Sequence, residues 1–351
     1  MKRKIIFSIS ISLFLTTAIV LILIEKGPQI SKSVTDELNS DHNLLIKYFP
    51  DSNHSLSSLK SSTESTTLIK NDLDKFRIKK IYPTLPGGTE WYVNMEQPLT
   101  DPFFLKEGLI IITPQSDGSL QISSEYNDNQ IRLHSRSPSN NKWLNTETTV
   151  YVKIVEYYGP DRTNDQFQIK SRGGSEHNRD KPCIGSAYIT RFYDLTTTPQ
   201  DRAGHIGFEK EVTHPAYTGV TLSDNMNLDG PLKGRWIGLK SIIYNINLNG
   251  STFVKLQAFI DQTSDRNGKL VISNNWKKVG ETIDNGWSTS DSEFNPFCPK
   301  LSINNQDEYR KRNEIISLPG GDETSNVITL RTDNALWNFK YFTVREILAP
   351  S

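Results

Sequence analysis

The chain has 351 residues, of which 35% are hydrophobic, 10% aromatic and 23% charged. This composition is typical of a globular protein with one large or two ordinary domains, and it excludes disorder along the whole chain. Forty Lys and Arg residues balance forty Asp and Glu residues, so no global positive charge attracts nucleic acid, and we expect no nucleic-acid partner.

The N-terminus predicts a membrane segment. Three cations among the first four residues precede an uncharged, mostly apolar stretch at 5–24, which ends at Glu25. Twenty such residues can cross a bilayer, whereas the apolar part of a secretory signal peptide has about 7–15, and no Ala-x-Ala cleavage site follows. We predict an uncleaved signal anchor over 1–26, with a cleaved signal peptide as the alternative. The rest of the chain then lies outside the membrane as an extracytoplasmic domain.

Residues 27–76 predict a flexible linker. The segment is rich in Ser, Thr, Asn and Asp and has few apolar side chains. Such a composition cannot bury enough apolar surface to offset the entropy of ordering the chain. We expect the linker to hold the remaining domain, 77–351, away from the membrane.

Residues 77–351 predict an all-β domain. Short runs alternate apolar and polar residues between clusters of Gly, Pro, Asn and Asp, which is the pattern of half-buried strands, and no helical stripe interrupts them. About a dozen strands without an internal repeat favour one antiparallel two-sheet sandwich over a propeller. The clearest predicted strands are 108–113, 119–124, 130–135, 148–158, 166–172, 187–193, 205–212, 235–246, 253–261, 276–284, 327–332 and 337–348.

The two cysteines, Cys183 and Cys298, are too few for a disulfide-rich miniprotein or a four-thiolate zinc site. Because an extracytoplasmic compartment permits oxidation, we predict a disulfide bond between them. Two separate buried thiols are the alternative.

Several stretches resemble the concanavalin A-like jelly-roll superfamily, and within it the polysaccharide-lyase-like and carbohydrate-binding members. The resemblance extends over roughly 85–350 and rests on Arg-Trp-Ile-Gly-Leu-Lys at 235–240 and on the segments 243–245, 254–257, 275–279 and 342–347. It implies a jelly-roll sandwich with a concave sheet face on which an extended glycan lies. Calcium is common in this superfamily, so the acidic segments 261–265 and 322–323 are candidates to hold it. We expect no other cofactor.

One strand suggests where a site would lie. Gln168, Lys170 and Arg172 alternate along 166–172, so their side chains are expected to leave one face of a sheet. The next strand, 187–193, sends either Tyr188 or its odd-numbered neighbours to that face, depending on register. Together with segment 205–217, these strands offer cations, phenols and imidazoles.

A lyase acting on a uronic acid polymer needs a cation or amide to neutralise the sugar carboxylate and a base to remove the adjacent proton. The sequence offers these residue types, although it has neither an Arg-x-Glu-x-Arg strand nor a Gln-Ile/Val-His strand. The predicted catalytic residues are Arg172, Tyr188, Lys210 and His214, and the predicted substrate-binding residues are Gln168, Lys170, His177 and Tyr217.

A retaining glycosidase needs a pair of carboxylates about 5–5.5 Å apart. Glu209 and Glu211 begin such a pattern, but His214 stands where the third acid of the run belongs. If the protein is an enzyme, a lyase is therefore favoured over a hydrolase. The function best matched by the sequence is a membrane-anchored glycan-binding sandwich. A polysaccharide lyase is the first alternative and a structural surface protein without a small ligand is the second.

Overall fold

The computed structural model describes residues 72–124, 130–139, 143–159, 163, 165–173, 187–213, 216–218, 220–285, 287, 326–333 and 335–350. The predicted anchor, both cysteines, His177 and His214 lie outside these residues. Within the described part of the chain, no helix is long and apolar enough to cross a membrane.

The described chain is all-β, as predicted, and all twelve predicted strands are present. The elements are β1 (Glu90–Tyr92), η2 (Pro98–Thr100), β2 (Phe104–Glu107), β3 (Ile110–Pro114), β4 (Leu120–Ser124), β5 (Gln130–Arg136), β6 (Thr146–Tyr157), β7 (Gln166–Gly173), β8 (Ala187–Tyr193), β9 (His205–Thr213), β10 (Ala216–Tyr217), β11 (Thr221–Asn225), β12 (Ile237–Leu248), β13 (Ser251–Asp261), β14 (Asp265–Arg266), β15 (Lys269–Leu270), β16 (Lys277–Asp284), β17 (Val327–Asp333) and β18 (Ala335–Glu346).

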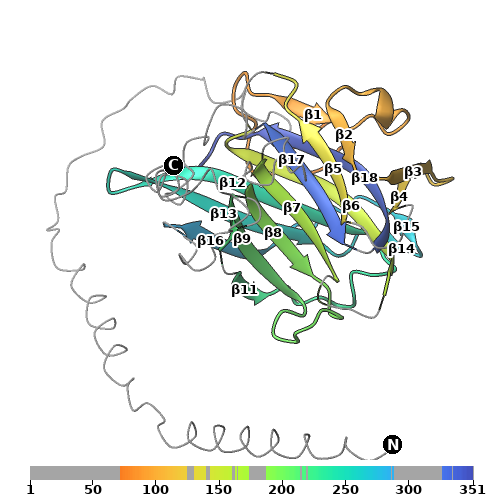
Figure 1. Ribbon diagram of the computed structural model, residues 1–351. Coiled ribbons are helices and arrows are strands. Elements are labelled where there is room, and N and C mark those ends of the chain that lie inside the picture. Colours follow the sequence, from red (N-terminus) through yellow and green to blue (C-terminus); the bar gives the residue numbers. More distant parts are fainter. Residues whose placement is uncertain are drawn as a thin grey trace, which may run out of the picture. The chain divides into compact units, whose positions relative to one another are not determined.

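Two antiparallel sheets stack on each other (Figure 1). The front sheet has the order β10-β9-β8-β7-β17-β5-β2, with β11 paired to β9. The back sheet has the order β16-β13-β12-β6-β18-β4-β3, with β1 paired to β18. The last two strands of the chain, β17 and β18, therefore lie inside the two sheets between strands formed much earlier in the sequence.

The hairpin between β12 and β13 shows how local sequence sets the strand register. Its turn is Asn249-Gly250, and both residues have positive φ, 54° and 82°. Asn-Gly is the residue pair that tolerates this two-residue turn, whose twist matches that of antiparallel strands. Leu248 consequently pairs with Ser251, and the ladder continues from there to Gly238 and Asp261.

The core lies between the sheets and is built from the alternating apolar residues that predicted the strands. Phe167 and Ile169 of β7 and Phe192 of β8 are fully buried in it. The ring of Phe167 packs edge-on against Trp337 of β18, with 5.2 Å between the centroids. Burial of each such side chain stabilises the fold by about 1.5–3 kcal/mol. Because these residues point inward, their strand neighbours on the front sheet face outward.

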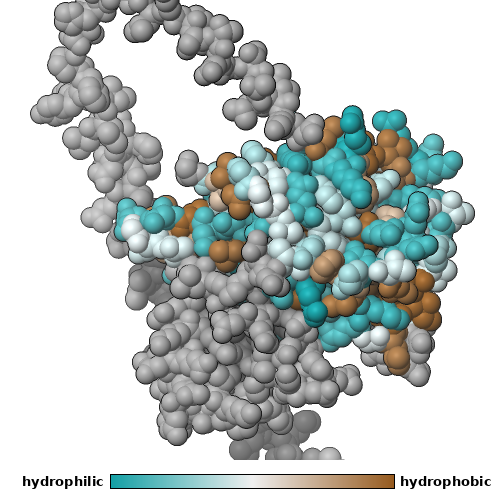
Figure 2. Space-filling view, turned by 90° about the horizontal axis from the view of Figure 1, so that it is seen from above, coloured by the Kyte–Doolittle hydropathy of each residue, from teal (hydrophilic) through white to brown (hydrophobic). Residues whose placement is uncertain are grey.

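The face of the molecule that is seen from above is mostly polar (Figure 2). Figure 2, which looks down on the molecule, shows mostly hydrophilic residues with apolar ones gathered in small groups. A ligand that binds this face therefore meets mainly hydrogen-bonding and charged groups.

Candidate functional site

Four long polar side chains lie side by side on the outer face of the front sheet. Gln168 of β7 is in register with Arg191 of β8 on one side and with Arg331 of β17 on the other. Arg331 is in turn opposite Arg132 of β5. All four leave the outer face because the residues next to them in sequence belong to the core. We call Arg191, Gln168, Arg331 and Arg132 the guanidinium row.

Each guanidinium of the row is held by one carboxylate. Arg191 donates through Nε and Nη2 to Glu209, at 3.2 Å for Nε. Arg331 makes two bonds of 2.9 Å to Asp333, and Arg132 donates to Glu107 at 2.8 Å. Charge-assisted pairs of this kind fix the plane of the guanidinium and so preorganise its direction.

Gln168 stands apart in this row because its side-chain amide is unpartnered. The residue is 1% exposed, and among the described residues neither its Nε2 nor its Oε1 has a hydrogen-bond partner. A buried polar group without a partner costs about 1–3 kcal/mol, and such groups are rare in folded proteins. The amide between the two guanidiniums is therefore a buried donor and acceptor that the described residues leave unsatisfied.

Lys170 lies two residues after Gln168 in β7, so its side chain is on the same face of the sheet. Its Nζ is 2.8 Å from Oε2 of Glu211, and both side chains are buried. Burial lowers the pKa of Lys170 to about 8, although the charge of Glu211 opposes that shift. Burial, followed by the charge of Glu211, raises the pKa of the neighbouring Tyr217 phenol. Tyr217 is therefore protonated at neutral pH.

A pocket of about 380 Å³ opens on the same face and is called the sheet pocket. Gln166, the strand neighbour of Gln168, and Arg191, its cross-strand neighbour, are both part of its wall. Within the described residues, Arg202 has no carboxylate partner, whereas Arg191 is paired with Glu209. The charged walls therefore have an excess of one positive charge. The pocket is lined by Thr163, Gln166, Arg191, Tyr193, Arg202, Glu209, Thr218 and Val220.

Arg172, Tyr188 and Lys210 do not join this face, which corrects the expectation that they share it with Gln168 and Lys170. Tyr188 and Lys210 point between the sheets, where Tyr188 donates to Asp284 at 2.5 Å and Lys210 lies 2.9 Å from the same oxygen. Arg172 also turns inward and donates from Nη2 to Asn245 of the back sheet at 2.8 Å.

The inward turn of Arg172 has a local cause. Arg172 has a positive φ of 56°, and the pairing of β7 with β17 shifts register between Val327 and Thr329. Such a bulge places two residues of one strand opposite one residue of its partner, which reverses the face on which the next side chain lies. The predicted site is thus divided: Gln168, Lys170 and Tyr217 belong to the front sheet's outer face. The catalytic and binding roles assigned to all these residues stay predictions.

Of the two calcium candidates, the structure describes the acidic segment 261–265. The Asp261 carboxylate accepts hydrogen bonds from Thr263 and Ser273, and Asp265 accepts from the backbone of Trp236. Within the described residues, no group of three His, Cys, Asp or Glu side chains could hold a metal ion. The second acidic candidate, 322–323, lies outside them.

No protein-family model and no curated protein matches the chain. Matching solved structures include a Bacillus subtilis protein of unknown function with a galectin-like fold (10% identity, TM-score 0.42, 77% of this chain and 100% of that one). An alginate lyase from Chlorella virus also matches (9%, 0.40, 73% and 98%), as does a Lotus tetragonolobus seed lectin (9%, 0.35, 75% and 100%). All three TM-scores are below 0.5, so these matches carry no argument about what this chain binds or does. The likeness concerns the fold alone.

Proposed function

We propose that the protein binds an acidic glycan on the outer face of the front sheet. The amide of Gln168 carries this proposal, since its Nε2 and Oε1 are buried and no described residue forms a hydrogen bond with them. A sugar hydroxyl can donate to Oε1 and accept from Nε2, and so would relieve both groups at once, whereas a sugar carboxylate would accept from Nε2. Arg191 and Arg331 flank Gln168 in register, and each is already paired with a carboxylate of the chain. The positive charge available to a sugar carboxylate is therefore that of Arg202 in the sheet pocket.

The sheet pocket supports the acidic character of the ligand. The one excess positive charge of the pocket belongs to Arg202, a half-buried residue in its wall. Among the described residues, no carboxylate pairs with Arg202. The rest of the pocket wall supplies amide, hydroxyl and phenol groups, which match the hydroxyls of a sugar ring. A neutral glycan would leave Arg202 without a counter-charge, so we expect it to bind less tightly.

Affinity electrophoresis tests the proposal with the full chain. We expect gels containing polygalacturonate or alginate to retard the protein and gels containing a neutral glucan to leave its mobility unchanged. Arg202→Ala removes the excess charge and should abolish most of the retardation. Arg266→Ala, at an exposed position on the short β14 strand, is the matched control and should behave as the unaltered chain. Equal mobility in all gels would contradict the proposal.

A polysaccharide lyase is the second candidate, and the lowered pKa of Lys170 is the observation that favours it. In this reaction, the neutral amine of Lys170 takes the proton next to the sugar carboxylate, whose charge Gln168 and Arg191 offset. The electron pair of the broken C–H bond forms a carbon–carbon double bond as the bond to the glycosidic oxygen breaks, and that oxygen takes the proton from the Lys170 ammonium. Ultraviolet absorbance of the unsaturated product, lost in Lys170→Arg, would support a lyase. Binding without such absorbance would leave glycan binding as the function.

We also propose that the domain is displayed outside a membrane by the segment 5–24, which has no charged residue. Expression in a cell envelope followed by sequencing of the mature N-terminus tests this. A mature chain that begins at Met1 is expected, and a start near residue 25–30 would favour a cleaved signal peptide.

A further inference from the structure

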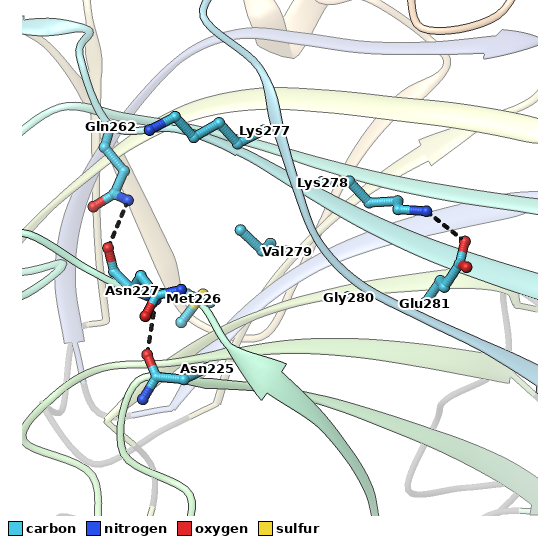
Figure 3. Close-up of a pocket in the computed structure, with 9 residues that line it drawn as sticks. All are labelled: Asn225, Met226, Asn227, Gln262, Lys277, Lys278, Val279, Gly280 and Glu281. Atoms are coloured by element: carbon cyan, nitrogen blue, oxygen red, sulfur yellow. Dashed lines mark hydrogen bonds and ion pairs between the residues drawn. The ribbon is translucent and has the colours of Figure 1, made fainter.

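A second pocket, of about 460 Å³, lies where the edges of the two sheets meet. It is called the edge pocket, and its walls come from the end of β11, the residue after β13 and the start of β16 (Figure 3). The sheets approach closely here: a Cβ on Gly280 would lie 2.9 Å from Oγ of Ser223. Gly280 therefore lets β11 rest against β16 and leaves the hollow beside them.

The edge pocket has an apolar floor and preorganised polar walls. Met226 and Val279, which are 2% and 9% exposed, form part of its lining. Oδ1 of Asn225 accepts the backbone N–H of Asn227 at 2.7 Å, and Nε2 of Gln262 donates to the Asn227 carbonyl at 3.2 Å. These bonds, drawn in Figure 3, hold the turn in place before any ligand arrives. A ligand would therefore pay little ordering entropy at the wall.

The charges in the edge pocket select an anionic group. Lys278 lies 2.9 Å from Glu281 and is neutralised by it. Lys277 extends toward Gln262 (Figure 3) and has no carboxylate partner among the described residues. An ammonium beside side-chain amides can bind a carboxylate together with hydroxyl groups.

The two pockets lie at the two ends of one exposed edge strand. Val220, just before β11, lines the sheet pocket, and Asn225, the last residue of β11, lines the edge pocket. Five residues of extended chain span roughly 17 Å. Thr221 and Leu222 between them are exposed, so a ligand can pass along the strand.

We infer that the edge pocket is a second binding site for an acidic sugar and that one extended acidic glycan occupies both pockets along β11. The inference rests on the proposed function. Once the first pocket holds one end of the glycan, the second binding event is intramolecular. Affinity therefore rises with chain length beyond what a single site gives, and short oligosaccharides are held by the sheet pocket alone.

Calorimetry with the full chain tests this, using a short oligouronate of two sugars and a long one of eight. We expect the long ligand to bind tighter than the short one. Lys277→Glu should weaken the long ligand by about tenfold or more and leave the short one unchanged. Lys269→Glu, an exposed lysine on β15, is the control for net charge and should change neither affinity.

The outcomes separate the inference from the proposed function. If Lys277→Glu leaves the affinity for the long ligand unchanged while Arg202→Ala abolishes binding of both ligands, the edge pocket is not a glycan site but the proposed function stands. If neither ligand binds the unaltered chain, the proposed function and the inference of a second site are both contradicted. Loss of the length effect in Lys277→Glu alone establishes the second site.

Discussion

The Lys210 ammonium lies 2.9 Å from the Asp284 carboxylate, and both side chains are completely buried between the two sheets. Lys210 belongs to the front sheet and Asp284 to the back sheet, so the pair joins the two layers. Tyr188 donates to the same carboxylate oxygen, and the backbone N–H of Trp287 donates to the other at 2.6 Å. Asp284 is thus the acceptor at the centre of a buried polar cluster.

We expect Asp284→Asn to lower the free energy of unfolding by about 3–5 kcal/mol, because it removes the carboxylate that faces a buried ammonium. The double variant Lys210→Met/Asp284→Leu should recover most of this loss, since it buries no charge at either position. Urea denaturation measures both values. Asp229→Asn, which alters an ion pair with an exposed aspartate, is the control. Full stability of Asp284→Asn would show that the pair contributes nothing.

Gln168→Met should weaken ligand binding without lowering the stability of the fold. Because the amide of Gln168 has no partner in the described part of the chain, its replacement by a side chain of similar length removes an unfavourable burial, and we expect an unchanged or higher Tm. Retardation by acidic glycan should fall at the same time. Gln257→Met is the matched control, since Gln257 accepts from Tyr82 at 2.8 Å and donates to Glu281 at 3.0 Å. It should lose about 1–3 kcal/mol, and equal losses in the two variants would contradict the argument.

The lowered pKa of Glu281 predicts that the fold becomes less stable in acid. Hydrogen bonds from Lys278 and Gln257 lower its pKa from 4.5 to about 2. A carboxylate with a lowered folded-state pKa stabilises the fold above pH 4.5, and this contribution disappears as the pH falls toward 2. Because the side chain is 39% exposed, we expect less than about 1 kcal/mol.

The measurement compares urea unfolding of the unaltered chain and Glu281→Gln. The difference in free energy of unfolding should be constant above pH 4.5 and should shrink as the pH is lowered toward 2. Glu156→Gln, at an exposed position of β6, controls for the loss of one negative charge. A difference that stays constant throughout this range would contradict the role given to Glu281.

The bond predicted between Cys183 and Cys298 would close a loop of about 115 residues and would stabilise the fold by about 3–5 kcal/mol in the chain-entropy model. Mass spectrometry of the alkylated chain without reduction should show neither cysteine modified. Two alkylated cysteines would contradict the prediction. Cys183→Ser/Cys298→Ser should then be as stable as the unaltered chain.

Alternation of apolar and polar residues was enough to predict the strands and the outer position of Gln168 and Lys170. The same alternation gave the wrong face for Arg172, because the bulge there depends on a positive φ at Arg172. A positive φ is uncommon for arginine, so nothing in the sequence indicated it. The inward direction of Lys210 could have been predicted, since Lys210 shares its alternation with Ile206 and Phe208, which are core residues. The positive charge of Lys210 led to the prediction that it faces outward, but a lysine can be buried where another strand provides its partner.

The guanidinium row was missed for a different reason. Arg132, Arg191 and Arg331 come from three strands far apart in sequence, and only the register of the front sheet brings them beside Gln168. The sequence left two possible faces for β8, and the face that carries Arg191 proved to be the outer one. Pairing register depends on long-range contacts, which no local pattern encodes.

The position of β17 and β18 has a consequence for how the domain is made. Both strands lie inside the sheets, with β18 between β6 and β4 and β17 between β7 and β5, yet they follow all the other described strands in sequence. Until they are made, β6 and β7 have unpaired edges, which are templates for aggregation. The two sheets can therefore be completed only once β18 has been made, and a stop codon placed just before β18 should yield an insoluble product rather than a slightly shortened domain.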